Sequence, residues 1–153
     1  MNNVNKESVI RDFLAQKTAA VVGVSRSGKE LSNYVFAALQ KAGIRTYPVN
    51  PHIQMIGGEF CFPDLSELPE RPDFVVVMVP PSQSLGVVEE AIRQHIRRVW
   101  VHQGATAPAV AEKCRAAGVS LVDGECLLMY LSPVTGGHKF HRWVRTLVGQ
   151  MPR

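Results

Sequence analysis

The strongest constraint on the fold of this chain is a regular alternation of short apolar runs with longer segments of helical periodicity. The apolar runs cover residues 18–24, 44–49, 73–79, 97–102 and 119–122. The helical segments cover residues 5–15, 31–42, 83–95, 107–117 and 138–149. Strands that are apolar on both faces and are joined by crossover helices form parallel sheets with helices on each side. The pattern therefore predicts a three-layer α/β/α fold with a mainly parallel sheet of five or six strands.

The length of 153 residues suits one domain with a sizeable core. We expect residues 1–153 to form it, with the helix near 138–149 packed on the rest. No apolar run reaches the roughly 18 residues that a membrane-spanning helix needs. Charged residues interrupt the apolar pattern of the N-terminal segment, which is unlike a secretory signal. We therefore expect a cytoplasmic protein that has no contact with a membrane.

The charge and the cysteine count weigh against two further classes of protein. The net charge is +4, but the basic residues are scattered apart from one group near the C-terminus, so nucleic acid is not an expected partner. The odd number of cysteines, without a C-x-x-C pair, argues against a disulfide framework and a structural zinc site. His138 and His141 could be metal ligands, but no third ligand lies near them in the sequence. A solvated basic face is the simpler interpretation, and we expect no metal.

A glycine-containing segment follows the first expected strand and nearly matches a P-loop. Gly23, Gly28 and Lys29 have the spacing of that motif, but Glu30 stands where a Ser or Thr should hold Mg²⁺. The strand over 73–79 ends without a carboxylate that could help to bind the metal. We therefore do not expect an NTPase site.

The same segment fits a dinucleotide-binding turn better. Gly23 permits a tight turn, and Ser25 takes the place of the middle glycine of that motif. Backbone N–H groups at the start of the next helix attract a pyrophosphate, and Arg26 and Lys29 add positive charge. The alternative is a plain strand-to-helix turn with solvated basic side chains.

The end of the second strand indicates which nucleotide such a turn would hold. An NAD site usually has an acidic residue there for the ribose 2′-hydroxyl, whereas residues 47–52 include none. The absence of a carboxylate permits a ribose phosphate, with Arg45 or His52 as its partner, which leaves NADP or coenzyme A. Nothing in the chain is typical of a hydride-transfer site, so we favour coenzyme A.

Five segments, in order, resemble those of the small stand-alone CoA-binding-domain proteins, whose Rossmann-like domain is similar to the N-terminal domain of the succinyl-CoA synthetase α subunit. The segments are Gly23-Val24-Ser25 with Lys29 and Ser32, Val49-Asn50-Pro51, Val79-Pro80-Pro81, Trp100-Val101-His102-Gln103-Gly104 and Val122-Asp123-Gly124-Glu125-Cys126. The resemblance covers about residues 10–130. It implies that the first loop holds the CoA pyrophosphate and that residues 49–51 and 79–81 line the nucleotide groove. The expected binding residues are Gly23, Val24, Ser25, Arg26, Lys29, Ser32, Val49, Asn50, Pro51, Val79, Pro80, Pro81, Gln103 and Gly104.

The synthetase also has a second domain with a phosphorylated catalytic histidine, for which this chain leaves no room. We therefore expect a protein that binds coenzyme A or an acyl-CoA without catalysis, either alone, as a homodimer or with an unknown protein partner. One alternative is an NAD(P)-binding redox regulator, although the 17 residues before the first strand are too few for a winged helix. Another is a small acyl-CoA enzyme using Cys126 or His102, for which a buried thiol and a loop hydrogen bond are the simpler interpretations.

Overall fold

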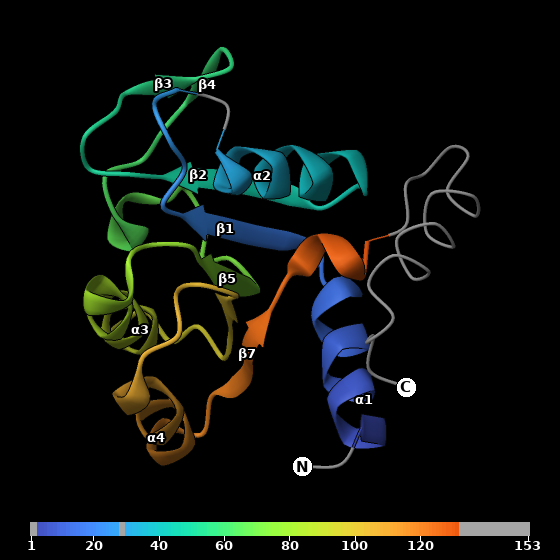
Figure 1. The fold of residues 1–153 in the computed structure, drawn as a ribbon. Helices are drawn as coiled ribbons and strands as arrows, with labels where there is room; N and C mark the ends of the chain where they lie inside the picture. Colours follow the sequence, from blue (N-terminus) through green and yellow to red (C-terminus); the bar gives the residue numbers. More distant parts are fainter. Residues whose placement is uncertain (1–2, 28–29, 132–153) are drawn as a thin grey trace.

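The structure, a computed structural model, describes residues 3–27 and 30–131 and contains a five-stranded parallel sheet (Figure 1). The strands are β1 (Thr18–Val22), β2 (Arg45–Val49), β5 (Phe74–Val77), β6 (Arg98–His102) and β7 (Ser120–Glu125), in the order β2-β1-β5-β6-β7. The helices are α1 (Asn3–Leu14), α2 (Leu31–Lys41), α3 (Pro81–Arg93) and α4 (Pro108–Ala117). The other elements are an antiparallel hairpin, β3 (Met55–Ile56) and β4 (Glu59–Phe60), and two 3₁₀ turns, η1 (Leu65–Glu67) and η2 (Leu127–Met129).

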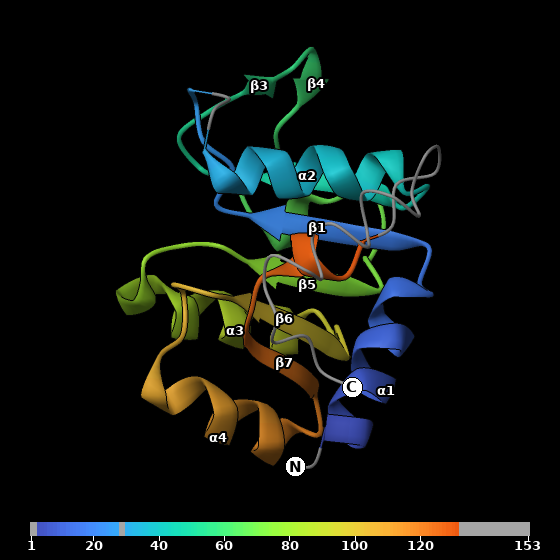
Figure 2. The same cartoon turned by 45° about the vertical axis from the view of Figure 1, so that its right-hand side comes forward.

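Helices cover both faces of the sheet (Figure 2). Successive residues of a strand point to opposite faces. Val21 and Val76 pack with α1 and α2, whereas Val22 and Val77 pack with α3 and α4. The expected Rossmann-like α/β/α architecture is therefore confirmed, with five strands. The helix expected near 138–149 lies outside the described residues.

β2 forms one edge of the sheet, and part of that edge is closed. Pro48 has no N–H to present there, and its carbonyl accepts a hydrogen bond from the Phe62 N–H at 3.0 Å. The Phe62 carbonyl accepts in turn from the Asn50 N–H at 2.9 Å. The chain that follows β4 therefore runs beside the last residues of β2.

α1 is fixed to the sheet by aromatic packing and by an ion pair. The ring of Phe13 is fully buried and lies edge-to-face against Phe74 and Trp100, at centroid distances of 5.6 and 5.9 Å. Lys6 pairs with Glu125 at the end of β7. The first helix is thus part of the domain core.

Replacing Phe13 with alanine is expected to lower the free energy of unfolding by about 3–5 kcal/mol, because it removes a buried aromatic ring and leaves a cavity. Urea denaturation followed by tryptophan fluorescence measures the change. Tyr34→Ala, at a position on α2 that is 58% exposed, serves as the control and should stay within about 0.5 kcal/mol of the wild type. Equal losses in the two variants would contradict the assignment of Phe13 to the core.

Candidate functional site

The carboxyl ends of the parallel strands meet at one edge of the sheet, and the strand order reverses there at β1. The chain first passes from β1 to β2 and then crosses to β5 on the other side of β1. The connections after β1 and β5 therefore lead to opposite faces of the sheet, and a crevice opens between them. In α/β proteins, ligands bind in the crevice at this position. The expected binding residues that the structure describes all lie at or after the ends of β1, β2, β5 and β6.

Gly23 joins the ends of three strands at this crevice. Its N–H donates to the Val49 carbonyl at the end of β2, at 3.0 Å, and its backbone packs against the Met78 carbonyl after β5. The φ angle of Gly23 is +111°, and a Cβ there would lie 2.3 Å from the Met78 oxygen. Glycine alone satisfies both requirements, so Gly23 makes the tight turn that we expect after the first strand.

Asn33 holds the segment that follows Gly23. The side-chain oxygen of Asn33 accepts from the Ser25 N–H, and its amide nitrogen donates to the Ser25 carbonyl, both at 3.0 Å. Asn33 lies in the first turn of α2 and is 8% exposed. The Ser25 N–H is therefore already bonded within the protein, and the Ser25 hydroxyl accepts from the Ser27 N–H at 3.3 Å and lies 3.2 Å from the Ser27 hydroxyl.

A second asparagine fastens the same loop from the end of β2. The amide nitrogen of Asn50 donates to the Val24 carbonyl at 2.7 Å, and its oxygen accepts from the His52 N–H at 2.7 Å. The guanidinium of Arg26 donates to the His52 carbonyl at 2.9 Å. Two of the expected binding residues, Asn50 and Arg26, thus connect the first loop to the second.

The remaining basic and hydroxyl residues of the first loop differ in their placement. Ser32 is 5% exposed, and its hydroxyl lies 3.4 Å from the Asn33 side-chain oxygen, so it faces the interior of the loop. Lys29 lies outside the described residues. Arg45 begins β2, far from the first loop, and pairs with Glu70 there. His52, after β2, stays at the carboxyl edge.

A cavity of about 380 Å³ opens beside this loop, between α3 and the segment around η1. Three expected residues, Val49, Pro51 and Val79, line it. Its other lining residues are mainly apolar: Val22, Pro63, Asp64, Leu65, Gln83, Gly86, Val87 and Glu90. Both carboxylates accept hydrogen bonds from backbone N–H groups of residues 65–66, so part of their polar character is already satisfied within the protein.

The expected residues after β5 and β6 lie on the surface at the same edge. Pro80 and Pro81 are exposed. Helix α3 begins at Pro81, where proline is well tolerated because backbone N–H groups in the first turn of a helix have no hydrogen-bond partner within the helix. Gln103 and Gly104 are also exposed. Their loop is fixed from α3, because the buried Ser84 hydroxyl donates to the Ala105 carbonyl at 2.5 Å. None of these four residues lines the cavity.

Cys126 and His102, the candidates for catalysis, do not form a nucleophile and base. Burial raises the pKa of the Cys126 thiol and lowers the pKa of the His102 imidazole. The hydrogen bond of the His102 ring is to the Gln103 carbonyl, at 3.1 Å from Nδ1. Both groups are therefore mainly neutral at pH 7, and the geometry offers no activated thiolate.

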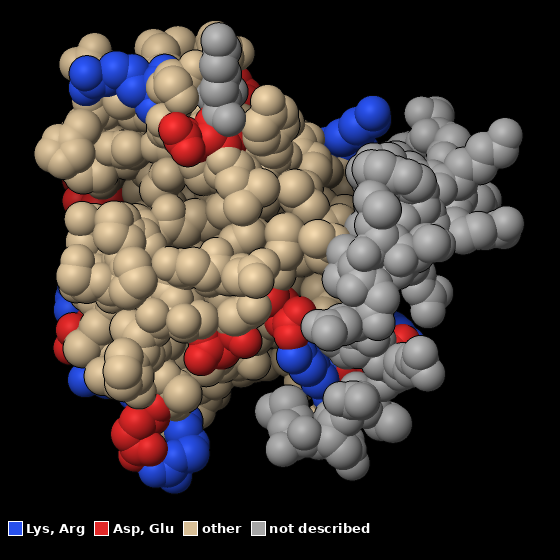
Figure 3. All heavy atoms as spheres, in the orientation of Figure 1, with Lys and Arg blue, Asp and Glu red and all other residues tan. Residues whose placement is uncertain are grey.

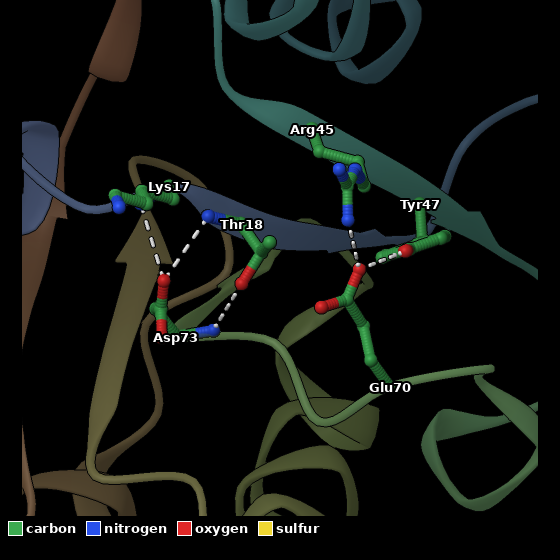
Figure 4. Close-up of polar contacts among 6 residues, drawn as sticks. All are labelled: Lys17, Thr18, Arg45, Tyr47, Glu70 and Asp73. Carbon is green, nitrogen blue, oxygen red and sulfur yellow. Dashed lines mark hydrogen bonds and ion pairs between the residues drawn. The ribbon is translucent and has the colours of Figure 1, made fainter.

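Another hollow, of about 1020 Å³, lies along β2 and the amino end of β1, and two of its carboxylates join strands (Figure 4). Asp73 accepts from two backbone N–H groups at the start of β1, at 3.1 Å each. Glu70 accepts from the Arg45 guanidinium at 2.9 Å and from the Tyr47 hydroxyl. The bonds from Tyr47 and Arg45 lower the pKa of Glu70. These contacts tie β1 and β2 to the segment before β5, so we assign them a structural role.

Charge, metal ligands and membrane spans can be assessed for the described part of the chain. In Figure 3, the Lys and Arg side chains on the face in view are interspersed with Asp and Glu. Within residues 3–27 and 30–131, no group of three His, Cys, Asp or Glu residues could hold a metal ion. None of the helices in the described part of the chain is long and apolar enough to cross a bilayer. The His138 and His141 pair lies outside that part.

Comparison with known proteins agrees with this geometry. The model of the CoA binding domain family matches residues 17–132. The chain belongs to this family. The match begins just before β1 and includes all five strands of the sheet.

Individual relatives are similar over most of the chain. The uncharacterized protein YneT of Bacillus subtilis is 28% identical, over 83% of this chain and 94% of that protein. An ADP-forming acetate–CoA ligase of Archaeoglobus fulgidus is 26% identical over 82% of this chain, which spans only 20% of the ligase. A hypothetical protein from Pyrococcus horikoshii has a similar structure, with a TM-score of 0.74, 25% identity and coverage of 84% of this chain and 88% of that one.

Gly23→Ala is expected to lower the free energy of unfolding by more than about 2 kcal/mol. The positive φ costs a side chain about 1–2 kcal/mol, and overlap with the Met78 carbonyl adds to this. Gly43→Ala is the matched control, because its φ is +90° but no atom lies within 4 Å of the added Cβ. Thermal or urea unfolding measures both changes, and equal losses would contradict the close packing of Gly23 on Met78.

Cys126 is expected to react with iodoacetamide more slowly at neutral pH than free cysteine does. Burial raises the pKa of this thiol, and the thiolate is the reactive form, so the rate should rise only at a higher pH than for free cysteine. Mass spectrometry of the peptide that contains Cys126 follows the reaction. A rate equal to that of free cysteine would favour the catalytic alternative.

Proposed function

We propose that this protein binds coenzyme A in the crevice at the carboxyl edge of the sheet, without catalysing a reaction on its own. One observation carries the proposal: the Gly23 turn lies beside the mainly apolar cavity, where the strand order reverses. The chain that contains both belongs to the CoA binding domain family. A turn of this kind suits a pyrophosphate, and an apolar slot beside it suits an adenine ring.

The parts of coenzyme A match different groups of residues. The pyrophosphate would lie over residues 24–27 and the start of α2, with Lys29 adding positive charge. The adenine ring would enter the cavity between Val49 and Val79. His52 and Arg26, which are both exposed beside the end of β2, are the nearest candidates to meet the ribose phosphate. The pantetheine arm would then run past Pro80 toward the loop after β6.

The absence of intrinsic catalysis is part of the proposal. It is supported by the protonated state of Cys126 and by the lack of a contact between that thiol and His102 among the hydrogen bonds of the described residues. We expect the protein to act in the cytoplasm as a small-molecule binder, with no nucleic-acid partner.

A thermal-shift panel of CoA, acetyl-CoA, succinyl-CoA, NAD, NADP and ATP tests the proposal. A ligand that binds only the folded protein raises its melting temperature, so the coenzyme A compounds should give the largest shifts. A larger shift with NADP or NAD, or no shift with any coenzyme A compound, would overturn it.

Gly86→Leu is expected to weaken CoA binding by at least about tenfold, because the new side chain fills the cavity from α3. No atom lies within 4 Å of a Cβ at Gly86, so the variant should fold, and replacing a helical glycine should stabilise it by up to about 1 kcal/mol.

Isothermal titration calorimetry measures the loss of binding, and Ala111→Leu on the exposed side of α4 is the matched control. A folded Gly86→Leu protein with unchanged affinity would place the adenine ring elsewhere.

A further inference from the structure

His102 is buried at the ligand edge with half of its hydrogen-bonding capacity unused. It is the last residue of β6 and is 1% exposed. Its Nδ1 lies 3.1 Å from the Gln103 carbonyl oxygen, and a carbonyl can only accept. Nδ1 therefore carries the proton, and Nε2 presents a lone pair.

Within the described residues, His102 Nε2 is the single buried side-chain nitrogen or oxygen atom without a hydrogen-bond partner. A buried polar group without a partner is destabilising, and one that persists in a native protein calls for an explanation. Burial also lowers the pKa of this imidazole, so the lone pair is available at pH 7. The atom is thus an unused acceptor, but it is closed to solvent, so a ligand can bond to it only after the side chains around it move aside.

The strand pairing at this point is irregular. Val101 pairs with Asp123, but His102 pairs with Glu125, so β7 has one extra residue there. Such bulges are common beside binding sites, and because the extra residue is in β7, the alternation of side chains along β6 is kept. The side chain of Trp100 also contacts β7 at the bulge, because its indole N–H donates to the Glu125 carbonyl at 2.9 Å.

His102 and the first loop lie at the same edge of the sheet, within the length of a pantetheine arm. Side chains two residues apart on a strand share a face, so His102 lies on the face of Trp100, where Val24 of the first loop also packs. The ends of β1 and β6 are separated by β5 alone, which corresponds to roughly 10 Å. The pantetheine arm, comparable to about four extended peptide residues, spans roughly 13 Å.

We propose that His102 Nε2 accepts a hydrogen bond from the thiol of bound coenzyme A, so that the protein selects free coenzyme A over its thioesters. The inference rests on the proposed function. A thioester sulfur has no hydrogen to donate, so an acyl-CoA leaves Nε2 without a partner. The selectivity therefore comes from one donor that only the free thiol carries.

The test compares CoA, acetyl-CoA and desulfo-CoA, in which hydrogen replaces the thiol, by isothermal titration calorimetry. The wild type should bind CoA at least about twofold more tightly than desulfo-CoA, the lower end for one hydrogen bond, because a thiol is a weak donor. Acetyl-CoA should also bind more weakly than CoA. Equal binding of CoA and desulfo-CoA would overturn the role of His102 and leave the proposed function standing, whereas no binding of any of the three would overturn both.

Two variants separate this role from a structural one. His102→Asn keeps a donor for the Gln103 carbonyl but removes the distal acceptor, so the preference for CoA over desulfo-CoA should disappear. His102→Gln places an oxygen near the position of Nε2 and should retain part of the preference. If His102→Asn weakens both ligands by the same factor, the role is structural and the inference is wrong.

Discussion

The close approach of Gly23 to the Met78 carbonyl is the contact on which the carboxyl edge of the sheet depends. The missing side chain lets β1 and β5 end side by side, and the hydrogen bond from Gly23 to Val49 adds the end of β2. From this point α2 begins, and Asn33 can reach back to the backbone of Ser25. The turn and the wall of the cavity are therefore parts of one connected structure rather than separate loops.

The two edges of the sheet use their polar groups differently. At the amino edge, carboxylates accept hydrogen bonds from strand N–H groups, a guanidinium and a phenol, and so hold the strands in register. At the carboxyl edge, asparagine amides bond to the backbone of the first loop, and two carboxylates of the cavity accept from backbone N–H groups. An anionic ligand approaching this edge thus meets a turn built mainly from amides and hydroxyls.

The elements of the fold could be predicted from the sequence because each depends on its own residues. Phe74–Val77 is apolar on both faces, and Gly23 follows the first strand directly. Contacts across long separations could not be predicted in this way. Asn33 shows no local pattern that reveals its bonds to Ser25. The position of Arg45, in contrast, follows from the predicted strand over 44–49, which puts it at the amino end.

Pro48 and Phe62 have a consequence for self-association. The imide nitrogen of Pro48 offers no proton to an incoming backbone, and Phe62 already occupies its carbonyl. A second copy of the chain therefore cannot lengthen the sheet continuously past β2. A homodimer that uses this end of β2 must therefore be built from side-chain contacts rather than from a shared backbone ladder.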